Sequence, residues 1–387
     1  MLSYCAEIRS PILTALIIGL GHVTHATAQE RAFLVDLNSK TVTELGTLGG
    51  VSTVPYDIND AGQVVGRSLT AEGVYHGFIT GPDGVGMRDV GTLGGRESWA
   101  LSINDAGQVA GDSPTSEDAH HAFITAPDGM GMRDLDTLGG KGAYSGAVGV
   151  NSAGQVAGSS GGPGVRPKEA FITGPDGMGM RGLGTFGGLE SSASGINDSG
   201  QVAGYYFRSE GGYHTFITGP NGAGMKDLGT LGGSDSIAYD LNDAGQVVGY
   251  SLTAENAYRG FITGPDGASM RDLGTLGGEH SFADDINDAG KAVGSSRTAD
   301  GGVSAFITGP DGMGMMDLNS LVDLPKGVIL IDAKGINNSG QVIASGIPEP
   351  ETYALMLVGL GLAGFMARRK KKENRGEITN PTEGLGS

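Results

Sequence analysis

The chain has 387 residues, of which 72 are glycine, and 18% of its residues are charged. Glycine at about 19%, against a usual value of about 7%, argues against a mainly helical protein, because glycine weakens a helix interior by about 1 kcal/mol. The net charge is −18; residues 1–28 sum to zero and residues 351–387 to +2, so residues 29–350 carry −20. Such an acidic body repels phosphate backbones, so we expect no nucleic-acid partner.

The first 28 residues are typical of a secretory signal peptide. Arg9 precedes an apolar stretch over Pro11–Leu20, and Ala26-Thr27-Ala28 has the small residues of a cleavage site before Gln29. An uncut anchor is the alternative, although ten apolar residues are too few to span a bilayer. The only cysteine also lies in this segment, so we expect the exported part to fold without disulfides.

Residues 29–346 contain one unit that is repeated seven times. An (I/L/V)-N-x-x-G-(Q/K) motif recurs every 45 to 50 residues, with its asparagines at Asn59, Asn104, Asn151, Asn197, Asn242, Asn287 and Asn337. A phenylalanine recurs every 45 to 48 residues, at Phe33, Phe78, Phe123, Phe171, Phe216, Phe261 and Phe306. A fixed period of this length indicates a repeat architecture, so one unit predicts the whole body.

Each unit is predicted to contain four short strands. In the fifth unit these are residues 236–242, 246–251, 259–263 and 270–273, separated by turn residues. The sequence Asn242-Asp243-Ala244-Gly245 fits a type I turn closed by a left-handed glycine bulge, with the asparagine side chain bonding the turn backbone. Gly264-Pro265-Asp266-Gly267 predicts a second turn, in which proline fixes φ.

Four strands in 40 to 50 residues is the pattern of a β-propeller blade, and an open solenoid is the rival interpretation. The terminal units decide between them. Arg31–Leu45 holds only the third and fourth strands of a unit, and Lys334–Ala344 holds only the first and second. In a solenoid the two half-units would leave unpaired strand edges, whereas in a ring they join as one blade. We therefore predict an all-β, seven-bladed β-propeller over residues 29–346, closed by two N-terminal and two C-terminal strands.

The unit resembles the HAF repeat of extracellular bacterial proteins, which is named for a His-Ala-Phe run after the N-x-x-G-Q-V turn. That run is intact at His121-Ala122-Phe123 and is altered in the other units, as at His76-Gly77-Phe78. The resemblance covers nearly the whole body. It implies a propeller fold and export, and it brings no established catalytic residues.

No motif for catalysis, a metal or a cofactor is found, so we predict a non-enzymatic protein without catalytic, cofactor-binding or metal-binding residues. Asp57–Gly62 approaches a D-x-N-x-D-G calcium loop, but Ala61 stands where an oxygen ligand is required. His76, His121 and His214 occupy the same position in three different blades, so one ion could not collect them.

The C-terminal segment combines a Pro348-Glu349-Pro350 motif, an apolar stretch over residues 353–367 and a basic cluster that consists of Arg368, Arg369, Lys370, Lys371 and Lys372. Fifteen apolar residues give a helix of about 22 Å, a short transmembrane segment whose basic end stays cytoplasmic. This order resembles the PEP-CTERM sorting signal over residues 347–372. A polar tail over residues 373–387 departs from that pattern, because such signals usually stop soon after the basic cluster.

The PEP-CTERM resemblance implies that the signal holds an exported protein transiently in the inner membrane. An exosortase then cuts near Pro-Glu-Pro and the body passes to the cell surface or outside, usually in bacteria that make exopolysaccharide. The resemblance thus implies exosortase as the processing partner.

Three functions remain open on the sequence. The first is a non-enzymatic surface or matrix propeller that binds exopolysaccharide or a surface protein, with the aromatic run Tyr205-Tyr206-Phe207 as a ligand face in a variable loop. The second is a secreted carbohydrate-active enzyme, a lyase or hydrolase, whose two carboxylates would converge about 5–10 Å apart in the channel. The third is a passive matrix protein.

Overall fold

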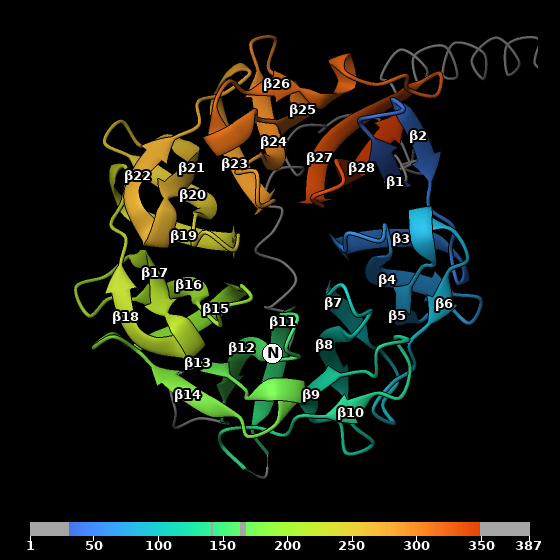
Figure 1. Cartoon of the computed structure of the whole chain (residues 1–387), viewed down its shortest axis with the longest axis vertical. Coiled ribbons are helices and arrows are strands. Elements are labelled where there is room, and N and C mark those ends of the chain that lie inside the picture. The colour runs from blue at the N-terminus through green and yellow to red at the C-terminus, as the bar shows by residue number, and fades with distance from the viewer. Residues whose placement is uncertain (1–30, 141, 163–167, 349–387) are drawn as a thin grey trace, which may run out of the picture.

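Each repeat predicted from the sequence folds into one four-stranded antiparallel sheet, and seven sheets form a ring around a central channel (Figure 1). This computed structural model describes residues 31–140, 142–162 and 168–348. The seven-bladed propeller is therefore confirmed. The signal peptide with Ala26, Ala28 and Gln29, and the segment from Glu349 to the end, lie outside the described residues.

Six blades are continuous in sequence, and their strands follow one another outwards from the channel. Blade 1 consists of β3 (Gly49–Ile58), β4 (Val64–Thr70), β5 (Tyr75–Ile79) and β6 (Arg88–Asp89). Blade 2 consists of β7 (Trp99–Ile103), β8 (Val109–Pro114), β9 (His120–Ile124) and β10 (Arg133–Asp134). Blade 3 consists of β11 (Tyr144–Val150), β12 (Val156–Gly161), β13 (Glu169–Ile172) and β14 (Arg181–Gly184). Blade 4 consists of β15 (Glu190–Ile196), β16 (Val202–Phe207), β17 (Tyr213–Gly219) and β18 (Ala223–Asp227). Blade 5 consists of β19 (Gly232–Leu241), β20 (Val247–Thr253), β21 (Tyr258–Gly264) and β22 (Ala268–Asp272). Blade 6 consists of β23 (Gly277–Ile286), β24 (Ala292–Thr298), β25 (Val303–Ile307) and β26 (Met316–Asp317).

Blade 7 joins the two ends of the described chain. Its order from the channel outwards is β27 (Val328–Ile336), β28 (Gln341–Pro348), β1 (Arg31–Asp36) and β2 (Thr41–Glu44). β1 and β28 pair over six residues, with Phe33 opposite Ala344. The predicted closure by two N-terminal and two C-terminal strands is confirmed, and β28 extends two residues past the predicted end of the propeller, to Pro348.

The turns within each blade have the chemistry that their sequences indicate. Gly245 has a φ of 70° and donates to the Asn242 carbonyl at 2.9 Å, as a glycine bulge requires. In the Gly-Pro-Asp-Gly turn, Asp266 is left-handed with a φ of 51°. Five turns of this second kind, and one further turn in blade 6, are short 3-10 segments: η1 (Pro82–Gly84), η2 (Pro175–Gly177), η3 (Pro220–Gly222), η4 (Pro265–Gly267), η5 (Pro310–Gly312) and η6 (Leu318–Ser320).

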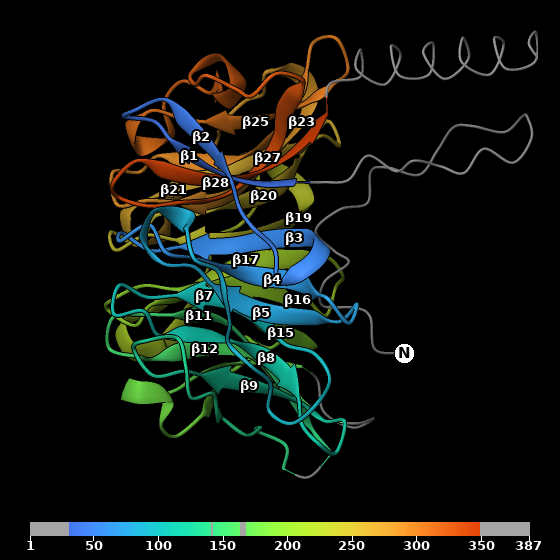
Figure 2. The ribbon, with the colours of Figure 1, turned by 90° about the vertical axis from the view of Figure 1, so that its right-hand side faces the viewer.

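Strand direction gives the ring two different faces, seen edge-on in Figure 2. Because the strands are antiparallel, the turns between strands one and two and between strands three and four lie on one face, here called the turn face. The loops between strands two and three and the linkers between blades lie on the opposite face, here called the loop face. β1 begins and β28 ends at the loop face, where Arg31 is opposite Gly346.

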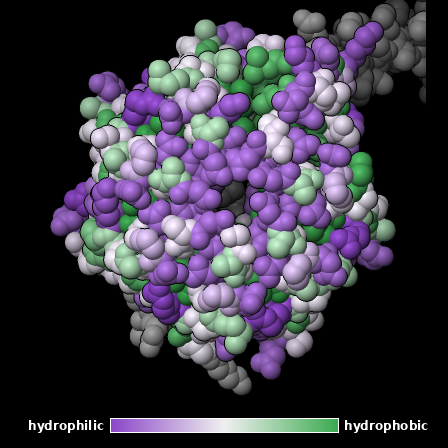
Figure 3. All heavy atoms as spheres, in the orientation of Figure 1, coloured by the Kyte–Doolittle hydropathy of each residue, from purple (hydrophilic) through white to green (hydrophobic). Residues whose placement is uncertain are grey.

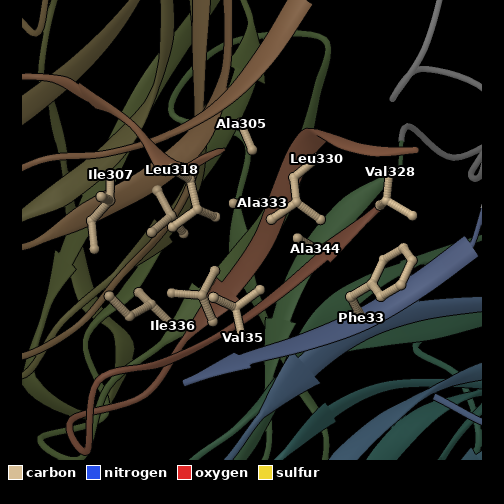
Figure 4. Packing of buried hydrophobic residues seen from close by; sticks show 12 residues of the cluster. Phe33, Val35, Ala305, Ile307, Leu318, Val328, Leu330, Ala333, Ile336 and Ala344 are labelled. Carbon is tan, nitrogen blue, oxygen red and sulfur yellow. The ribbon is translucent and has the colours of Figure 1, made fainter. Parts of the chain in front are cut away.

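The hydrophobic core lies between neighbouring blades. The seven repeated phenylalanines are 0–1% exposed, and each shares a core cluster with apolar residues of the preceding blade. In the cluster of Figure 4, Phe33 of β1 shares its surroundings with Val293, Ala305 and Ile307 of blade 6 and with Leu330 and Ala344 of blade 7. Burial of this kind, about 25 cal/mol per Å² of apolar surface, makes each blade depend on its neighbour.

Candidate binding faces of the ring

A closed belt of asparagine side chains links the seven blades at the turn face. Each asparagine accepts a hydrogen bond at Oδ1 from the backbone N–H four residues later, as in the 3.0 Å bond from Gln246 to Asn242. Its Nδ2 donates to the carbonyl of the corresponding asparagine in the next blade, at 2.8–3.2 Å, in an unbroken circuit through Asn59, Asn104, Asn151, Asn197, Asn242, Asn287 and Asn337. The belt fixes the turns that form the mouth of the channel.

The mouth of the channel is acidic. The residue after each asparagine points into a hollow of about 200 Å³, and five of these residues are aspartates: Asp60, Asp105, Asp198, Asp243 and Asp288. Several of these aspartates also link neighbouring blades, since Asp243 accepts the backbone N–H of Asp198 at 2.9 Å and Asp288 accepts that of Asp243 at 3.0 Å. Figure 3 shows hydrophilic residues gathered around the opening on this face.

Three more carboxyl groups line the same hollow; they belong to Asp57, Asp240 and Asp285, on the innermost strands β3, β19 and β23. Asp57 accepts the N–H of Ile58 at 2.7 Å and that of Ile103 in the next blade at 2.9 Å. Asp285 likewise accepts from Ile286 at 2.7 Å and from Ile336 in the next blade at 2.6 Å. Both aspartates therefore bridge blades through the backbone.

Burial, together with a neighbouring carboxylate, raises the pKa of two of these carboxyl groups. Burial and the nearby charge of Asp285 raise the pKa of Asp57 to about 7. Burial, the charge of Asp285 and a hydrogen bond with it raise the pKa of Asp240 well above its usual range. Burial is the largest cause of the raised pKa for both Asp57 and Asp240, and the charge of Asp285 adds to it.

The described part of the chain contains no group of three or more His, Cys, Asp or Glu side chains that could hold a metal ion. The three histidines singled out in the sequence lie in separate blades and contact aspartates of their own blades. The Nδ1 atoms of His76, His121 and His214 lie 2.7, 2.8 and 2.9 Å from Asp89, Asp134 and Asp227. These pairs connect the third and fourth strands.

The aromatic run predicted as a loop lies instead in β16, because this strand continues to Phe207 and pairs with β15 and β17. Alternation along the strand separates its members. Tyr206 is 5% exposed, donates its hydroxyl to Asp227 at 2.7 Å and lies 5.2 Å from Phe186, ring to ring. Burial and Asp227 raise the pKa of Tyr206. Tyr205 and Phe207 are half-buried on the other side of the strand, near the loop face.

Tyr205 and Phe207 have aromatic neighbours that the sequence analysis did not single out. Tyr213, at the start of β17, lies 5.6 Å from Tyr205 and 4.9 Å from Phe207, ring to ring. Tyr250 of blade 5 occupies the repeat position of Tyr205, directly after the glycine of the second strand. Superimposing the repeats would have shown this shared position, whereas the contacts between blades required the folded ring.

The first residue of the predicted Pro-Glu-Pro motif belongs to a strand of blade 7. Pro348 is the last residue of β28 and is opposite Val328 of β27. Glu349, Pro350 and the basic cluster at residues 368–372 lie outside the described residues. Within the described part of the chain, no helix is long and apolar enough to cross a membrane.

Comparison with known proteins identifies the C-terminal segment and the fold. Residues 346–371 match the PEP-CTERM protein-sorting motif. This motif indicates export through a membrane-anchored stage and sorting by an exosortase, so the chain is a seven-bladed β-propeller that carries a PEP-CTERM signal. No curated protein matches the sequence significantly.

Solved structures are similar in fold alone. The β-propeller domain of the trilobed protease from Pyrococcus furiosus is 10% identical with a TM-score of 0.52, and the match covers 75% of this chain and 87% of that one. TolB from Acinetobacter baumannii is 11% identical with a TM-score of 0.46, and the match covers 84% of this chain and 65% of that one. The first is described as having an open velcro topology, whereas blade 7 here combines both ends of the described chain.

Proposed function

We propose that the protein is an exported, non-enzymatic propeller of the cell surface or extracellular matrix, which binds exopolysaccharide or another surface component. The sorting motif at residues 346–371 carries the proposal, because it indicates export through a membrane-anchored stage and sorting by an exosortase. The blades are proposed to be HAF-type repeats, and the loop face is proposed to hold the ligand, because its loops and flanking strand ends vary most from blade to blade.

The hydrogen bonds of the channel carboxyl groups support a structural role for them. Asp57 and Asp285 each use their oxygens to hold backbone N–H groups of two blades.

A secreted carbohydrate-active enzyme is the second candidate. The raised pKa of Asp57 and Asp240 is the property that a general acid needs near neutral pH. Turnover of a polysaccharide by the wild-type protein that is abolished in Asp240→Asn would establish this candidate and exclude the non-enzymatic one.

Sorting is tested by expression in an exosortase-containing host. We expect Glu349→Ala combined with Pro350→Ala to leave the unprocessed form in the inner membrane, because the cleavage motif is altered. Removal of residues 373–387 is the matched control and should leave processing and surface display as in the wild type. Equal display of the wild type and of a chain that ends at Pro348 would overturn the sorting proposal.

A further inference from the structure

Aromatic rings gather on three adjacent blades of the ring. We call this group the aromatic band; it consists of Tyr205, Phe207 and Tyr213 of blade 4, Tyr239, Tyr250 and Tyr258 of blade 5, and Phe282 of blade 6. Within blade 5, Tyr250 lies 5.5 Å from Tyr239 and 5.6 Å from Tyr258, ring to ring. It also lies 5.3 Å from Phe282, so blades 5 and 6 are joined by ring contacts.

Blades 4 and 5 are joined by polar contacts. Burial is the main cause of the raised pKa of Tyr250, and the hydroxyl groups of Tyr205 and Tyr213 in blade 4 add to it. Asp235 of β19 accepts the backbone N–H of Tyr213 at 3.0 Å. Because the members lie on strands and contact one another, the rings are held in place before any ligand arrives, which lowers the entropy cost of binding.

The band is a local addition to a repeated scaffold. The repeat position of Tyr205 and Tyr250 is occupied by Arg67 and Asp112 in blades 1 and 2, and by a serine in the other three blades: Ser159, Ser295 and Ser345. Packing of the ring therefore does not require a tyrosine at this position. The two tyrosines fall in adjacent blades, which makes one surface instead of two separate ones.

The rings keep surface for a ligand. Tyr258 is 41% exposed, and the other members are half-buried. Their hydroxyl groups add hydrogen-bonding partners to apolar faces, so the band combines the two chemistries of a sugar ring, an apolar C–H face and a polar edge.

Charge narrows the class of ligand. Glu190 accepts from the Tyr213 hydroxyl at 3.3 Å, and Asp235 accepts the backbone N–H of Tyr213 at 3.0 Å. A cation also lies beside the band, since the Lys168 ammonium is 6.0 Å from the centre of the Tyr205 ring. Arg208, next in sequence to Phe207, instead contacts His214 at 2.9 Å and Glu210 at 3.4 Å. Carboxylates and ring faces attract cations and repel anions.

We propose that the aromatic band binds a polysaccharide chain that is neutral or carries amino groups, and that it discriminates against polyuronates. The inference rests on the proposed function and adds a site and a ligand class to it. Tyr205, Tyr250 and Tyr258 supply the stacking faces, and Glu190 and Asp235 supply the charge selection.

Calorimetry with the processed protein tests this site, with cellohexaose, a fully deacetylated chitosan hexamer and an alginate hexamer as probes. We expect wild-type protein to bind the first two and to bind alginate at least tenfold more weakly. Tyr258→Ala should weaken both favoured probes about tenfold, because one stacking face is lost. Tyr144→Ala is the matched control, since Tyr144 is an exposed tyrosine of blade 3, and it should bind as the wild type does.

Glu190→Gln separates charge selection from stacking. This variant keeps an acceptor for the Tyr213 hydroxyl and removes the charge, so cellohexaose affinity should persist while the preference for chitosan over alginate narrows. If the wild type binds the favoured probes and Tyr258→Ala binds them with equal affinity, the site is overturned while the proposed function stands. Surface display without binding to any of the three probes would overturn both the ligand part of the proposed function and the site.

Discussion

The repeated asparagine performs two tasks that require an amide side chain. Its oxygen accepts a backbone N–H within its own turn, and its nitrogen donates to the turn of the next blade, as in the 3.0 Å bonds from Asn242 to Asn287 and from Asn337 to Asn59. A carboxylate can accept but cannot donate. The first task could be predicted from the turn motif, whereas the second required a neighbour that is 45 residues away along the chain or more.

The raised pKa of Asp57 predicts that the protein loses stability as the pH rises toward neutrality. Its pKa of about 7 in the folded protein exceeds the value of about 3.9 of an unfolded chain, so between these values the folded state alone holds the proton. The raised pKa of Asp240 acts in the same direction. We therefore expect the free energy of unfolding to fall as the pH rises from about 4 to about 7, as measured by urea denaturation.

Asp57→Asn checks the assignment to this residue. The amide cannot titrate, so the slope between about pH 4 and 7 should flatten, even if the loss of one acceptor lowers stability at every pH. Asp60→Asn removes the same charge at the exposed mouth of the channel and should keep the wild-type slope. A free energy of unfolding that rises over this range would contradict the argument.

At the scale of the strand, glycine and phenylalanine form a matched pair in the continuous blades. A Cβ added to Gly204 of β16 would lie 2.8 Å from Cζ of Phe216 and would also meet the backbone carbonyl of Ser192. The second strand thus needs glycine because the backbone of the first strand and the ring of the third strand approach it closely. The paired residues explain why the repeat keeps glycine inside a strand, where it has no conformational advantage.

Gly204→Ala is expected to destabilise the protein by about 3 kcal/mol or more, because strand and ring must both move. Gly46→Ala is a matched control, since an added Cβ there meets no atom within 4 Å and the backbone is not left-handed. Guanidinium denaturation of both variants measures the difference. A Gly204→Ala protein as stable as Gly46→Ala would show that the pair is not needed.

Most elements could be predicted because the repeat supplied seven copies of each signal. The turns at Asn242 and Pro265 carried fixed backbone chemistry, and the half-units at the two ends predicted closure. The end of β16 was misplaced because Phe207 precedes a polar, glycine-containing stretch that is typical of a loop, although the strand predicted at residues 246–251 covers the repeat positions of Tyr205 and Tyr206. The aromatic band was missed for a related reason: its members are neighbours across blades, and periodicity does not show which blades touch through which side chains.

At the scale of the whole molecule, stability should depend on the closing strand and not on the sorting segment that follows it. A chain that ends at Pro348 keeps every register pair of β28 with β1 and β27, so we expect its melting temperature to equal that of the longer chain. A chain that ends at Gly340 loses β28, which leaves β27 and β1 without their shared partner and exposes two strand edges. Circular dichroism should then show no cooperative transition.

A cooperative transition at an unchanged temperature in the chain ending at Gly340 would contradict this dependence on closure. Ligand assays on the chain ending at Pro348 would also show whether the aromatic band works without the sorting segment, as the placement of the band in blades 4 to 6 implies.

The position of β28 has a mechanical consequence. It is the second strand from the channel and is hydrogen bonded along both edges, over six residue pairs with β1 and seven with β27. Hydrogen bonds of antiparallel strands are perpendicular to the strand, so tension applied along the chain beyond Pro348 loads both ladders in shear, and many bonds must yield together. A force on the chain beyond Pro348 would therefore be shared by both ladders of blade 7 and would not peel β28 away one hydrogen bond at a time.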